Sequence, residues 1–252
     1  MLLKQPHPRA NTPRVSLIEI AGENALARVE IVPMTSKHTT WWQKEVQPII
    51  ENNYRDLADT KSTKKVRADR GWKWPRIRRL LYVHNIGHVG TWIGAHAIGL
   101  TMVAINKEDE QIPVGLLTFV PSYLCRADKF GRKTYMWFVS AAPKEIYSKH
   151  LDGDTLEGVA KALFDAAILE SYKCKLDGSL LLHASPDGGI KLVDIYEDMG
   201  FRRLRPVLGP LTFYRWRKRS QYMTLNSTGA LNLSKENDVY RSSLAPSGKP
   251  ST

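Results

Sequence analysis

The 252-residue chain has little cysteine and no Cys-x-x-Cys pair. Its two cysteines, Cys125 and Cys174, are too few for a secreted disulfide scaffold and fit a reducing cytosol. The first residues lack the continuous apolar core of a secretory signal. We therefore expect a cytoplasmic protein.

Long hydrophobic runs are also scarce. The uncharged stretch Ile86–Ile105 is long enough to cross a bilayer, but it contains two histidines and four glycines, and a hairpin pattern adjoins it. We expect no membrane span.

His84 and His88 have a spacing that can bind zinc on a helix, but no Glu stands beside the first His and no Cys is near. We expect no metal site.

Acidic residues are almost missing from two segments, and this explains the net charge of +12. Lys61–Leu80 holds nine Lys and Arg against one acid, and Arg202–Arg219 holds seven against none. Two such segments can build one positive face. This face is either a solvated surface or a site for polyanions such as nucleic acid, an acidic protein, anionic lipid or the phosphates of coenzyme A.

The first basic segment also carries tryptophans among its cations. Aromatic rings interleaved with cations can stack bases and pair phosphates. In the alternative interpretation, the tryptophans pack against the domain and the arginines stack on them. The candidate substrate or nucleic-acid contacts are Lys64, Lys65, Arg67, Arg70, Trp72, Trp74, Arg76, Arg78 and Arg79.

The hydrophobic pattern along the chain alternates between strand and helix periods. Pro48 should kink or divide the first helix. The predicted order is a strand, a helix capped near Thr35, a hairpin, a strand, a helix, a strand, a helix and two more strands. The expected segments are Ala27–Pro33, Trp41–Tyr54, Ala97–Ile105, Val114–Leu124, Thr134–Ser140, Leu156–Lys175, Leu180–Phe201, Phe201–Arg205 and Leu211–Trp216. The fold class is α/β, with a mixed, mostly antiparallel sheet flanked by helices.

The segment Leu180–Phe201 is the most informative unit of this order. An apolar strand beginning at Leu180 runs into the turn formers Ser185–Gly189, and a short helix follows with Tyr196 on its inner face. Gly200 stands where a left-handed helix cap belongs.

This unit resembles the C-terminal half of the GNAT acyltransferase superfamily. The family ends its fifth strand and fourth helix in Tyr-x-x-x-Gly-Phe, here Tyr196 to Phe201. The family's Asn and Ala, seven and four residues before the Tyr, are replaced by Gly189 and Leu192. The resemblance spans about Ala27–Trp216 and implies a GNAT-like fold that transfers an acyl group from acyl-CoA, with acetyl-CoA the expected donor, to an amine.

The resemblance implies roles for several residues. Tyr196 matches the acid that protonates the departing thiolate, although a core tyrosine would give the same pattern. Backbone groups around Phe138, Val139 and Ser140 would stabilise the oxyanion, and Gly158, Val159 and Ala160 match the start of the helix that holds the coenzyme's pyrophosphate.

The phosphate loop departs from the family pattern, because Gly153 and Leu156 replace its Gln/Arg and its middle Gly. Either Lys144 or Lys149 supplies the missing cation, or the coenzyme sits differently, or the domain binds none.

The base is less defined. The strand Thr134–Ser140 has no carboxylate. His183, on the neighbouring strand, has the intrinsic pKa to relay a proton, or it is an ordinary core histidine. The cysteines lack a histidine context and receive no role.

The predicted organisation is an N-terminal extension (residues 1–26, partly disordered, with little order over Met1–Pro13), a GNAT-like domain (27–219) with a basic insertion at about 61–96, and a flexible tail (220–252). The first hypothesis is an N-acetyltransferase acting on an anionic macromolecule, such as RNA, tRNA or an acidic protein. The second is a catalytically silent GNAT-like module that binds nucleic acid or protein. An unrelated α/β nucleic-acid binder is a third.

Overall fold

The computed structural model describes residues 7–23, 25–57, 63–87, 96–125, 131–204 and 221–241. Within them the strands are β1 (Leu17–Glu19), β2 (Leu26–Pro33), β3 (Ile98–Ile105), β4 (Gln111–Cys125), β5 (Gly131–Ala141), β6 (Leu180–Ala184), β7 (Arg202–Arg203) and β8 (Gln221–Leu225). The helices are α1 (Ser36–Glu45), α2 (Gln47–Asn53), α3 (Trp74–Gly87), α4 (Lys144–His150), α5 (Val159–Lys173), α6 (Gly189–Asp198) and α7 (Ser227–Glu236), with short 3-10 turns η1 (Pro186–Gly188) and η2 (Asp238–Tyr240).

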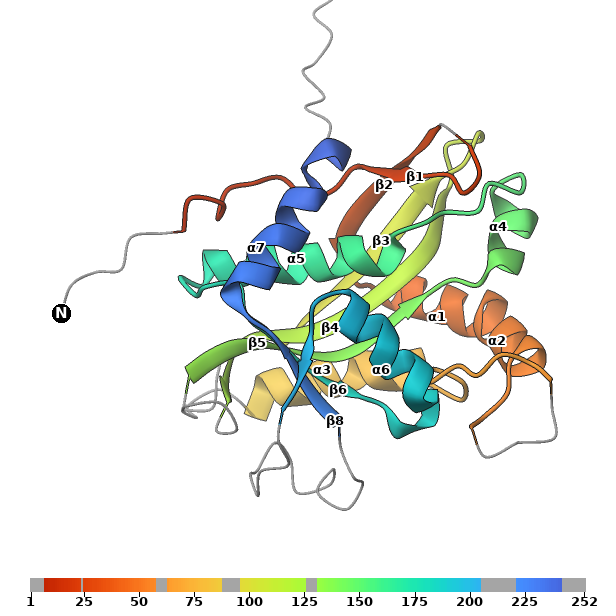
Figure 1. The fold of residues 1–252 in the computed structure, drawn as a ribbon. Coiled ribbons are helices and arrows are strands. Elements are labelled where there is room, and N and C mark those ends of the chain that lie inside the picture. Colours follow the sequence, from red (N-terminus) through yellow and green to blue (C-terminus); the bar gives the residue numbers. More distant parts are fainter. Residues whose placement is uncertain are drawn as a thin grey trace, which may run out of the picture.

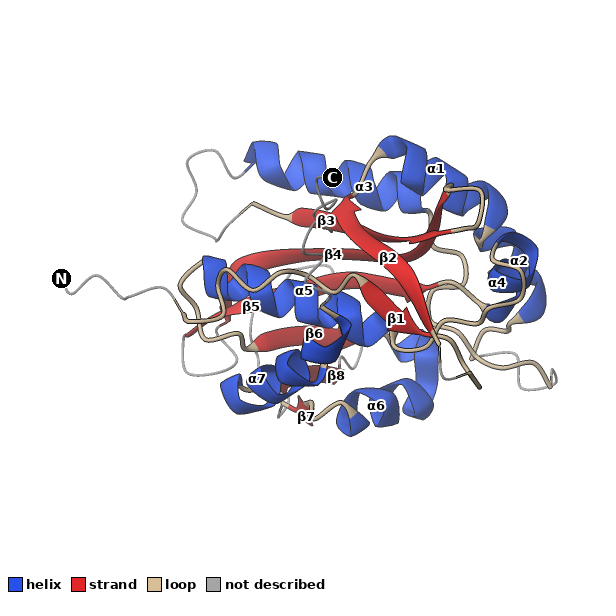
Figure 2. Ribbon diagram, turned by 90° about the horizontal axis from the view of Figure 1, so that it is seen from above, coloured by secondary structure: helices blue, strands red, loops and turns tan. Residues whose placement is uncertain are grey.

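The described strands form one sheet in the order β1-β2-β3-β4-β5-β6-β8-β7. Neighbouring strands are antiparallel except β5 and β6, which run parallel. Helices α1 and α3 cover one face, and α5 and α7 cover the other (Figures 1 and 2). The predicted fold class, a mixed and mostly antiparallel sheet flanked by helices, is confirmed.

The first helices begin and end where the sequence signals them. Thr35 caps α1, its side chain accepting a hydrogen bond from the His38 backbone while the His38 ring bonds back to Thr35. Pro48 lies in the first turn of α2, so the predicted division of this helix is confirmed. Trp42 of α1 is fully buried and meets Trp74 edge to face, with ring centroids 6.2 Å apart.

The core lies between the sheet and α5, most of whose residues are buried. Gly115 of β4 makes this close approach feasible, because a Cβ there would lie 2.7 Å from Val159 Cγ1. The short helix α4 was not predicted. It buries only Ile146 and Tyr147, too few apolar positions to show a helical period.

The prediction of a flexible tail from Ser220 is wrong for residues 221–241. Strand β8 lies between β6 and β7, and α7, capped by Asn226, packs beside α5. The sequence looks tail-like because α7 buries only Ala230, Leu233 and Ser234, so most of its residues are polar. Residues 242–252 lie outside the described part of the chain.

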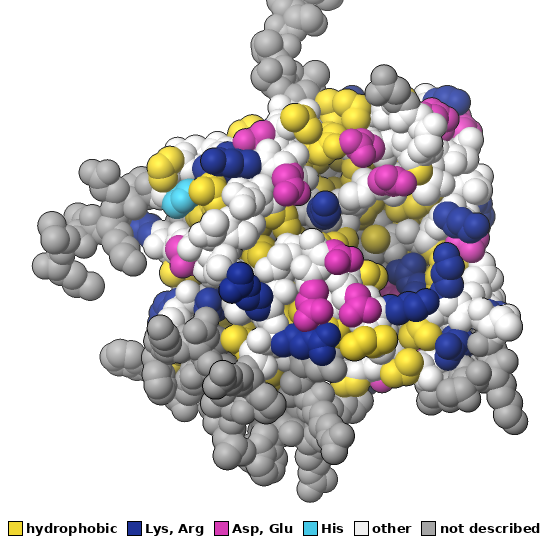
Figure 3. All heavy atoms as spheres, in the orientation of Figure 1, with side chains coloured by type: hydrophobic (Ala, Val, Ile, Leu, Met, Phe, Trp, Pro, Cys, Tyr) yellow, Lys and Arg dark blue, Asp and Glu magenta, His cyan; other side chains and the backbone are white. Residues whose placement is uncertain are grey.

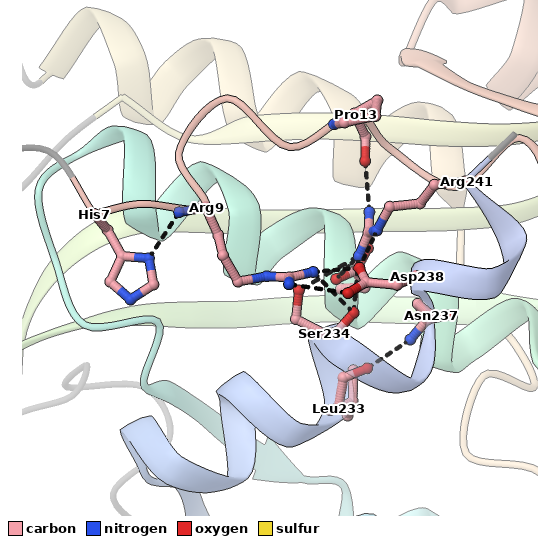
Figure 4. A network of polar contacts seen from close by, with 9 residues as sticks. His7, Arg9, Pro13, Leu233, Ser234, Asn237, Asp238 and Arg241 are labelled. Carbon is pink, nitrogen blue, oxygen red and sulfur yellow. Dashed lines mark hydrogen bonds and ion pairs between the residues drawn. The ribbon is translucent and has the colours of Figure 1, made fainter. Parts of the chain in front are cut away.

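Two arginines join the first and last segments of the described chain (Figure 4). Arg241 Nη2 donates to Asp165 Oδ1 at 2.7 Å and to the Ser234 carbonyl at 3.0 Å. Arg9 reaches the same place and pairs with Asp238. We call this group of side chains the terminal clasp.

The expectation of little order over Met1–Pro13 is wrong for residues 7–13. The His7 ring stacks on Tyr172 at 3.7 Å, and Ala10 is buried. The sheet also begins before residue 27, because β1 pairs with β2.

The last two predicted strands cannot both be found in the described structure. The strand expected at Phe201–Arg205 is reduced to β7, and the one at Leu211–Trp216 lies outside the described residues. Among the helices that can be described, none is long and apolar enough to cross a membrane. The second half of the uncharged stretch is strand β3.

Candidate active site

A cleft opens where β5 and β6 separate. The two strands pair from Thr134 to Met136, but pairing does not continue as β5 proceeds to Ala141. On the other side of β5, Phe138 faces Thr118 and Met136 faces Phe119, so Trp137 is an extra residue. An extra residue is a β-bulge, which bends its strand. The bulge at Trp137 therefore accounts for the splay between β5 and β6.

The cleft has a volume of about 630 Å³, in the range that suits a small-molecule arm. Its walls come from β5, β6, α5, α6 and the segment before α3. They comprise Val66, Arg67, Ala68, Asp69, Trp72, Met136, Trp137, Phe138, Val139, Ser140, Ala141, Ala160, Phe164, Leu182, His183, Ser185, Pro186, Asp187, Gly188, Lys191, Leu192, Ile195, Tyr196 and Met199. The surface is hollowed beside α6, with Lys and Arg side chains next to the hollow (Figure 3).

Tyr196 lies in the cleft wall on α6. Its ring packs on Phe164 and Phe201, and the residue is only 8% exposed. Burial raises the pKa of Tyr196, and the negative charge of Asp69 adds to this effect. Gly200, with a φ of +88°, ends the helix as predicted. The phenol is thus both packed and cleft-lining, which leaves its role as an acid a prediction.

His183 also lines the cleft, from β6. It is half-buried, and its ring lies 5.1 Å from that of Tyr222 of β8. The sequence pattern did not predict strand β8, which positions Tyr222, so the contact between His183 and Tyr222 was not predicted either.

The predicted coenzyme contacts divide into two groups. Phe138, Val139, Ser140 and Ala160 line the cleft, whereas Gly158 and Val159 do not. The Val159 side chain is buried against the backbone of Gly115 on β4, so close that a side chain at position 115 would collide with it.

The start of α5 has a neighbour that the sequence did not suggest. The Glu157 N–H donates to the Glu19 carbonyl at 2.9 Å, and Ile20 bridges to Leu156. The end of β1 therefore occupies backbone groups in the loop before the helix.

Among the described residues, two cations line the cleft, and neither is one proposed to replace the missing loop residue. Lys149 Nζ instead bonds Glu45 at 2.7 Å, and Lys144 is exposed on α4, outside the cleft. The lining cations are Lys191 of α6 and Arg67. Lys191 had no sequence signal beyond its place in the helix.

Arg67 belongs to a buried polar cluster with Asp69 and Ser140. Arg67 Nε and Nη2 donate to the two Asp69 carboxylate oxygens at 2.8 and 2.6 Å, and Nη2 also donates to the Ala141 carbonyl at 2.7 Å. The Ser140 hydroxyl donates to Asp69 Oδ2. Burial acts to lower the pKa of Arg67, but the bonds to Asp69 leave it above its ordinary value. We call these three residues the cleft cluster.

Sequence reasoning missed Asp69 as a site residue. The available signal was that Asp69 is the one acid among nine cations in Lys61–Leu80. In the structure the Gln47 side chain holds this residue in place, because Gln47 Nε2 donates to the Asp69 backbone carbonyl at 3.0 Å.

The remaining residues of the basic segment are scattered. Trp74 is fully buried, so it cannot stack a base, and its predicted nucleic-acid contact is wrong. Trp72 packs edge to face on Phe138 at 5.0 Å in the cleft wall. Arg70 pairs with Asp56, and Lys64 and Lys65 are exposed.

Of the predicted insertion, the described residues Trp74–Gly87 form helix α3, which packs against α1. Along α3, Arg76 and Arg79 are exposed and Arg78 is half-buried. A second hollow, of about 580 Å³, is lined by Gln43, Lys73, Pro75, Arg76, Arg79, Leu80 and Val83. We call Lys73, Arg76 and Arg79 the α3 cations.

Of the two histidines considered as metal ligands, His84 lies within the described residues. His84 of α3 meets Trp137 edge to face at 4.8 Å, and His88 lies outside the described residues. No group of three or more potential ligands occurs among the residues described.

Several solved structures are similar to this chain. A chimera of the spermidine N-acetyltransferase SpeG from Vibrio cholerae and hSSAT is 14% identical, with a TM-score of 0.40, over 81% of this chain and 98% of that chain. A probable GNAT-family acetyltransferase from Chromobacterium violaceum is 10% identical, with a TM-score of 0.39, over 87% and 95%. The protein of the KacTA–DNA complex is 10% identical, with a TM-score of 0.40, over 83% and 99%.

In fold, the chain resembles these acetyltransferases. No protein-family model matches it, and no curated protein matches it in sequence. Likeness at these identities and TM-scores does not bear on activity, so the function has to be inferred from the cleft itself.

Proposed function

We propose that this protein is an acyl-CoA-dependent N-acyltransferase that uses acetyl-CoA and works in the cleft between β5 and β6. The observation that carries the proposal is the bulge at Trp137, which separates two parallel strands beside a buried tyrosine. A thioester placed there would have strand backbone on one side and the Tyr196 phenol on the other.

Each wall would have a task. Backbone groups on the β6 side of Trp137 to Ser140, where β5 and β6 no longer pair, would polarise the thioester carbonyl. The apolar wall of Met136, Phe138 and Trp72 would pack against the pantetheine arm. Lys191, at the cleft, has a charge that suits the coenzyme's phosphates.

Tyr196 would protonate the departing thiolate. A phenol and a thiolate are of comparable basicity, so the transfer is not strongly uphill. Burial raises the pKa of Tyr196 and so weakens it as an acid, but the same desolvation would make a thiolate in the cleft more basic, which keeps the two groups matched.

The acceptor we propose is an amine on an anionic macromolecule, such as RNA, an aminoacyl-tRNA or an acidic protein. Trp72 lies in the cleft wall, and the α3 cations begin at the next residue and follow the exposed side of the helix. A polyanion held along α3 would therefore lie beside the cleft mouth.

The test combines binding and turnover. Isothermal titration with acetyl-CoA should give saturable binding to the wild-type protein. Tyr196→Phe should lower turnover at least tenfold, about the lower range of general-acid effects, while the acetyl-CoA Kd stays near that of wild type. Tyr82→Phe, which removes an exposed phenol from α3, is the matched control. Unchanged turnover in Tyr196→Phe would remove this residue from the acid role.

A silent GNAT-like module that binds nucleic acid or protein is the second candidate. The bond from the Glu157 N–H to the Glu19 carbonyl favours it, because this bond uses a backbone donor just before α5. No binding of acetyl-CoA at millimolar concentration would decide for this candidate.

A further inference from the structure

The cleft cluster contains a hydroxyl whose hydrogen already has a partner. Ser140 donates to Asp69, and both residues are buried, at 4% and 5% exposed. A serine oxygen that donates its only hydrogen to a carboxylate can still accept through its lone pairs. Any group that meets Ser140 Oγ from the cleft must therefore bring a hydrogen of its own, as an amine does.

Arg67 holds the Asp69 carboxylate in position beside Ser140. Two bonds from Arg67 satisfy its carboxylate oxygens. The guanidinium beside it offsets the cost of burying the charge of a carboxylate. Arg67 is itself fixed by the Ala141 carbonyl and lies over the Tyr54 ring, 5.1 Å from its centroid.

The cluster also faces the proposed acid. Asp69, Ser140 and Tyr196 line the same cleft, from the segment before α3, from β5 and from α6. The charge of Asp69 is felt at the Tyr196 hydroxyl, since it contributes to the raised pKa of that phenol. A reacting thioester between them would have a proton acceptor and a proton donor on different walls.

We propose that Ser140 and Asp69 form a proton relay that receives the proton of the acceptor amine, with Arg67 as the positioning residue. The inference rests on the acyltransferase function proposed above. Strand β5 has no carboxylate that could serve as the base. The proposal assigns this role to Asp69, which lies in the segment before α3.

The step balances as follows. The amine nitrogen bonds to the thioester carbonyl carbon, and its proton passes to Ser140 Oγ while the Ser140 proton passes to Asp69 Oδ2. The carbon–sulfur bond breaks, and sulfur takes the proton of Tyr196. Asp69 then loses a proton to solvent and Tyr196 regains one. A nitrogen that has attacked a carbonyl is far more acidic than a free ammonium, so a carboxylate can accept its proton.

The experiment compares two acceptors. Both nitrogens lose a proton after attack on the carbonyl, but hydroxylamine is a much weaker base than butylamine, so its attacked nitrogen is more acidic and depends less on a base. Thiol release from acetyl-CoA is measured at saturating amine for wild type, Asp69→Asn and Ser140→Ala. Asp69→Asn should lower kcat about a hundredfold with butylamine and less than about tenfold with hydroxylamine. Ser140→Ala should follow the same pattern, and the double variant should lose no more than Asp69→Asn.

Two controls separate the relay from a structural effect. Asp56→Asn removes an exposed acid outside the cleft, the partner of Arg70, and should leave both rates unchanged. The acetyl-CoA Kd and the midpoint of thermal unfolding are measured for every variant. Ser140→Ala keeps the Arg67–Asp69 pair and serves as the test if Asp69→Asn does not fold.

Each outcome is decisive. Equal losses with both amines, or no loss with butylamine, overturn the relay. A wild-type protein that binds acetyl-CoA but acetylates neither amine also overturns it and leaves the coenzyme site standing. A wild-type protein that does not bind acetyl-CoA removes the proposed function, and the relay with it.

Discussion

The terminal clasp and the cleft cluster are built around the same kind of ion pair. In each, an arginine donates to an aspartate and to a backbone carbonyl, Arg241 to Asp165 and Ser234, Arg67 to Asp69 and Ala141. They differ in what surrounds them. The Arg241 and Asp165 side chains are 4% and 0% exposed, whereas those of Arg67 and Asp69 are 19% and 7% exposed and line a cleft.

The difference separates a structural pair from one available for chemistry. A pair enclosed on all sides can only hold segments together, and here it ties the end of the described chain to the middle of α5. A pair open on one side keeps its charge fixed while a ligand approaches. Burial of an Arg–Asp pair is therefore a weaker indication of function than the presence of a cleft beside it.

The largest expected effect is on the clasp. Arg241→Ala leaves the Asp165 carboxylate buried without its guanidinium and should lower the free energy of unfolding by about 3–5 kcal/mol. Denaturant unfolding measures this change. Asp165→Asn in the same background should recover part of the loss, and Arg203→Ala, at the exposed pair with Glu197, should cause no measurable change. A wild-type-like stability for Arg241→Ala would contradict the enclosed character of the pair.

The clasp should also respond to pH with a definite sign. Burial raises the pKa of Asp165, although Arg241 acts against it, so ionised Asp165 costs the folded state stability as pH rises through that raised pKa. Without Arg241 the pKa should rise further. The penalty of Arg241→Ala should therefore be largest at neutral pH and shrink in acid, as unfolding measured across that range would reveal.

The cleft cluster should lose less stability and more activity. After Arg67→Ala, water from the cleft can hydrate Asp69, so we expect a loss of about 2 kcal/mol, smaller than for Arg241→Ala. Acetyl transfer per folded molecule should fall, whereas Arg241→Ala should leave it unchanged once folded protein is counted. Both variants are assayed for unfolding and for turnover. If they lost stability and turnover to the same extent, the distinction between the terminal clasp and the cleft cluster would be wrong.

The smallest expected effect on stability comes from exposed arginines. Arg76→Glu with Arg79→Glu alters charges on α3 that the sheet does not bury, so the unfolding midpoint should move little. The double variant should instead weaken RNA binding and flatten its salt dependence. An equally strong, equally salt-dependent interaction would exclude these two residues as the anionic contact. Acetyl-CoA binding is the control and should be unaffected.

The unit around Tyr196 was the part of the site most open to prediction. The helix α6 is amphipathic, Gly200 adopts the left-handed conformation expected, and the strand before it is buried on both sides. These are local properties, set by spacing and by one residue without a Cβ. They were sufficient to place the phenol on the inner face of the helix.

The C-terminal segment and Asp69 were missed because their partners are distant in sequence. Strand β8 is only five residues long and gains its place by pairing with β6. Asp69 reads as one acid in a basic run, and it becomes a cleft residue only when β5 brings Ser140 to it. Pairing of this kind leaves no period in the sequence.

The sequence alone determined the strands and helices with a strong hydrophobic period, the division at Pro48, the cap at Gly200 and the position of Tyr196 on its helix, since each follows from the side chains of a short stretch. The tertiary structure decided which charges are enclosed, which face the cleft and which remain in solvent. The physical reason is that desolvation and ion pairing depend on the atoms within a few ångströms of a group, and those atoms come from segments far apart in the chain.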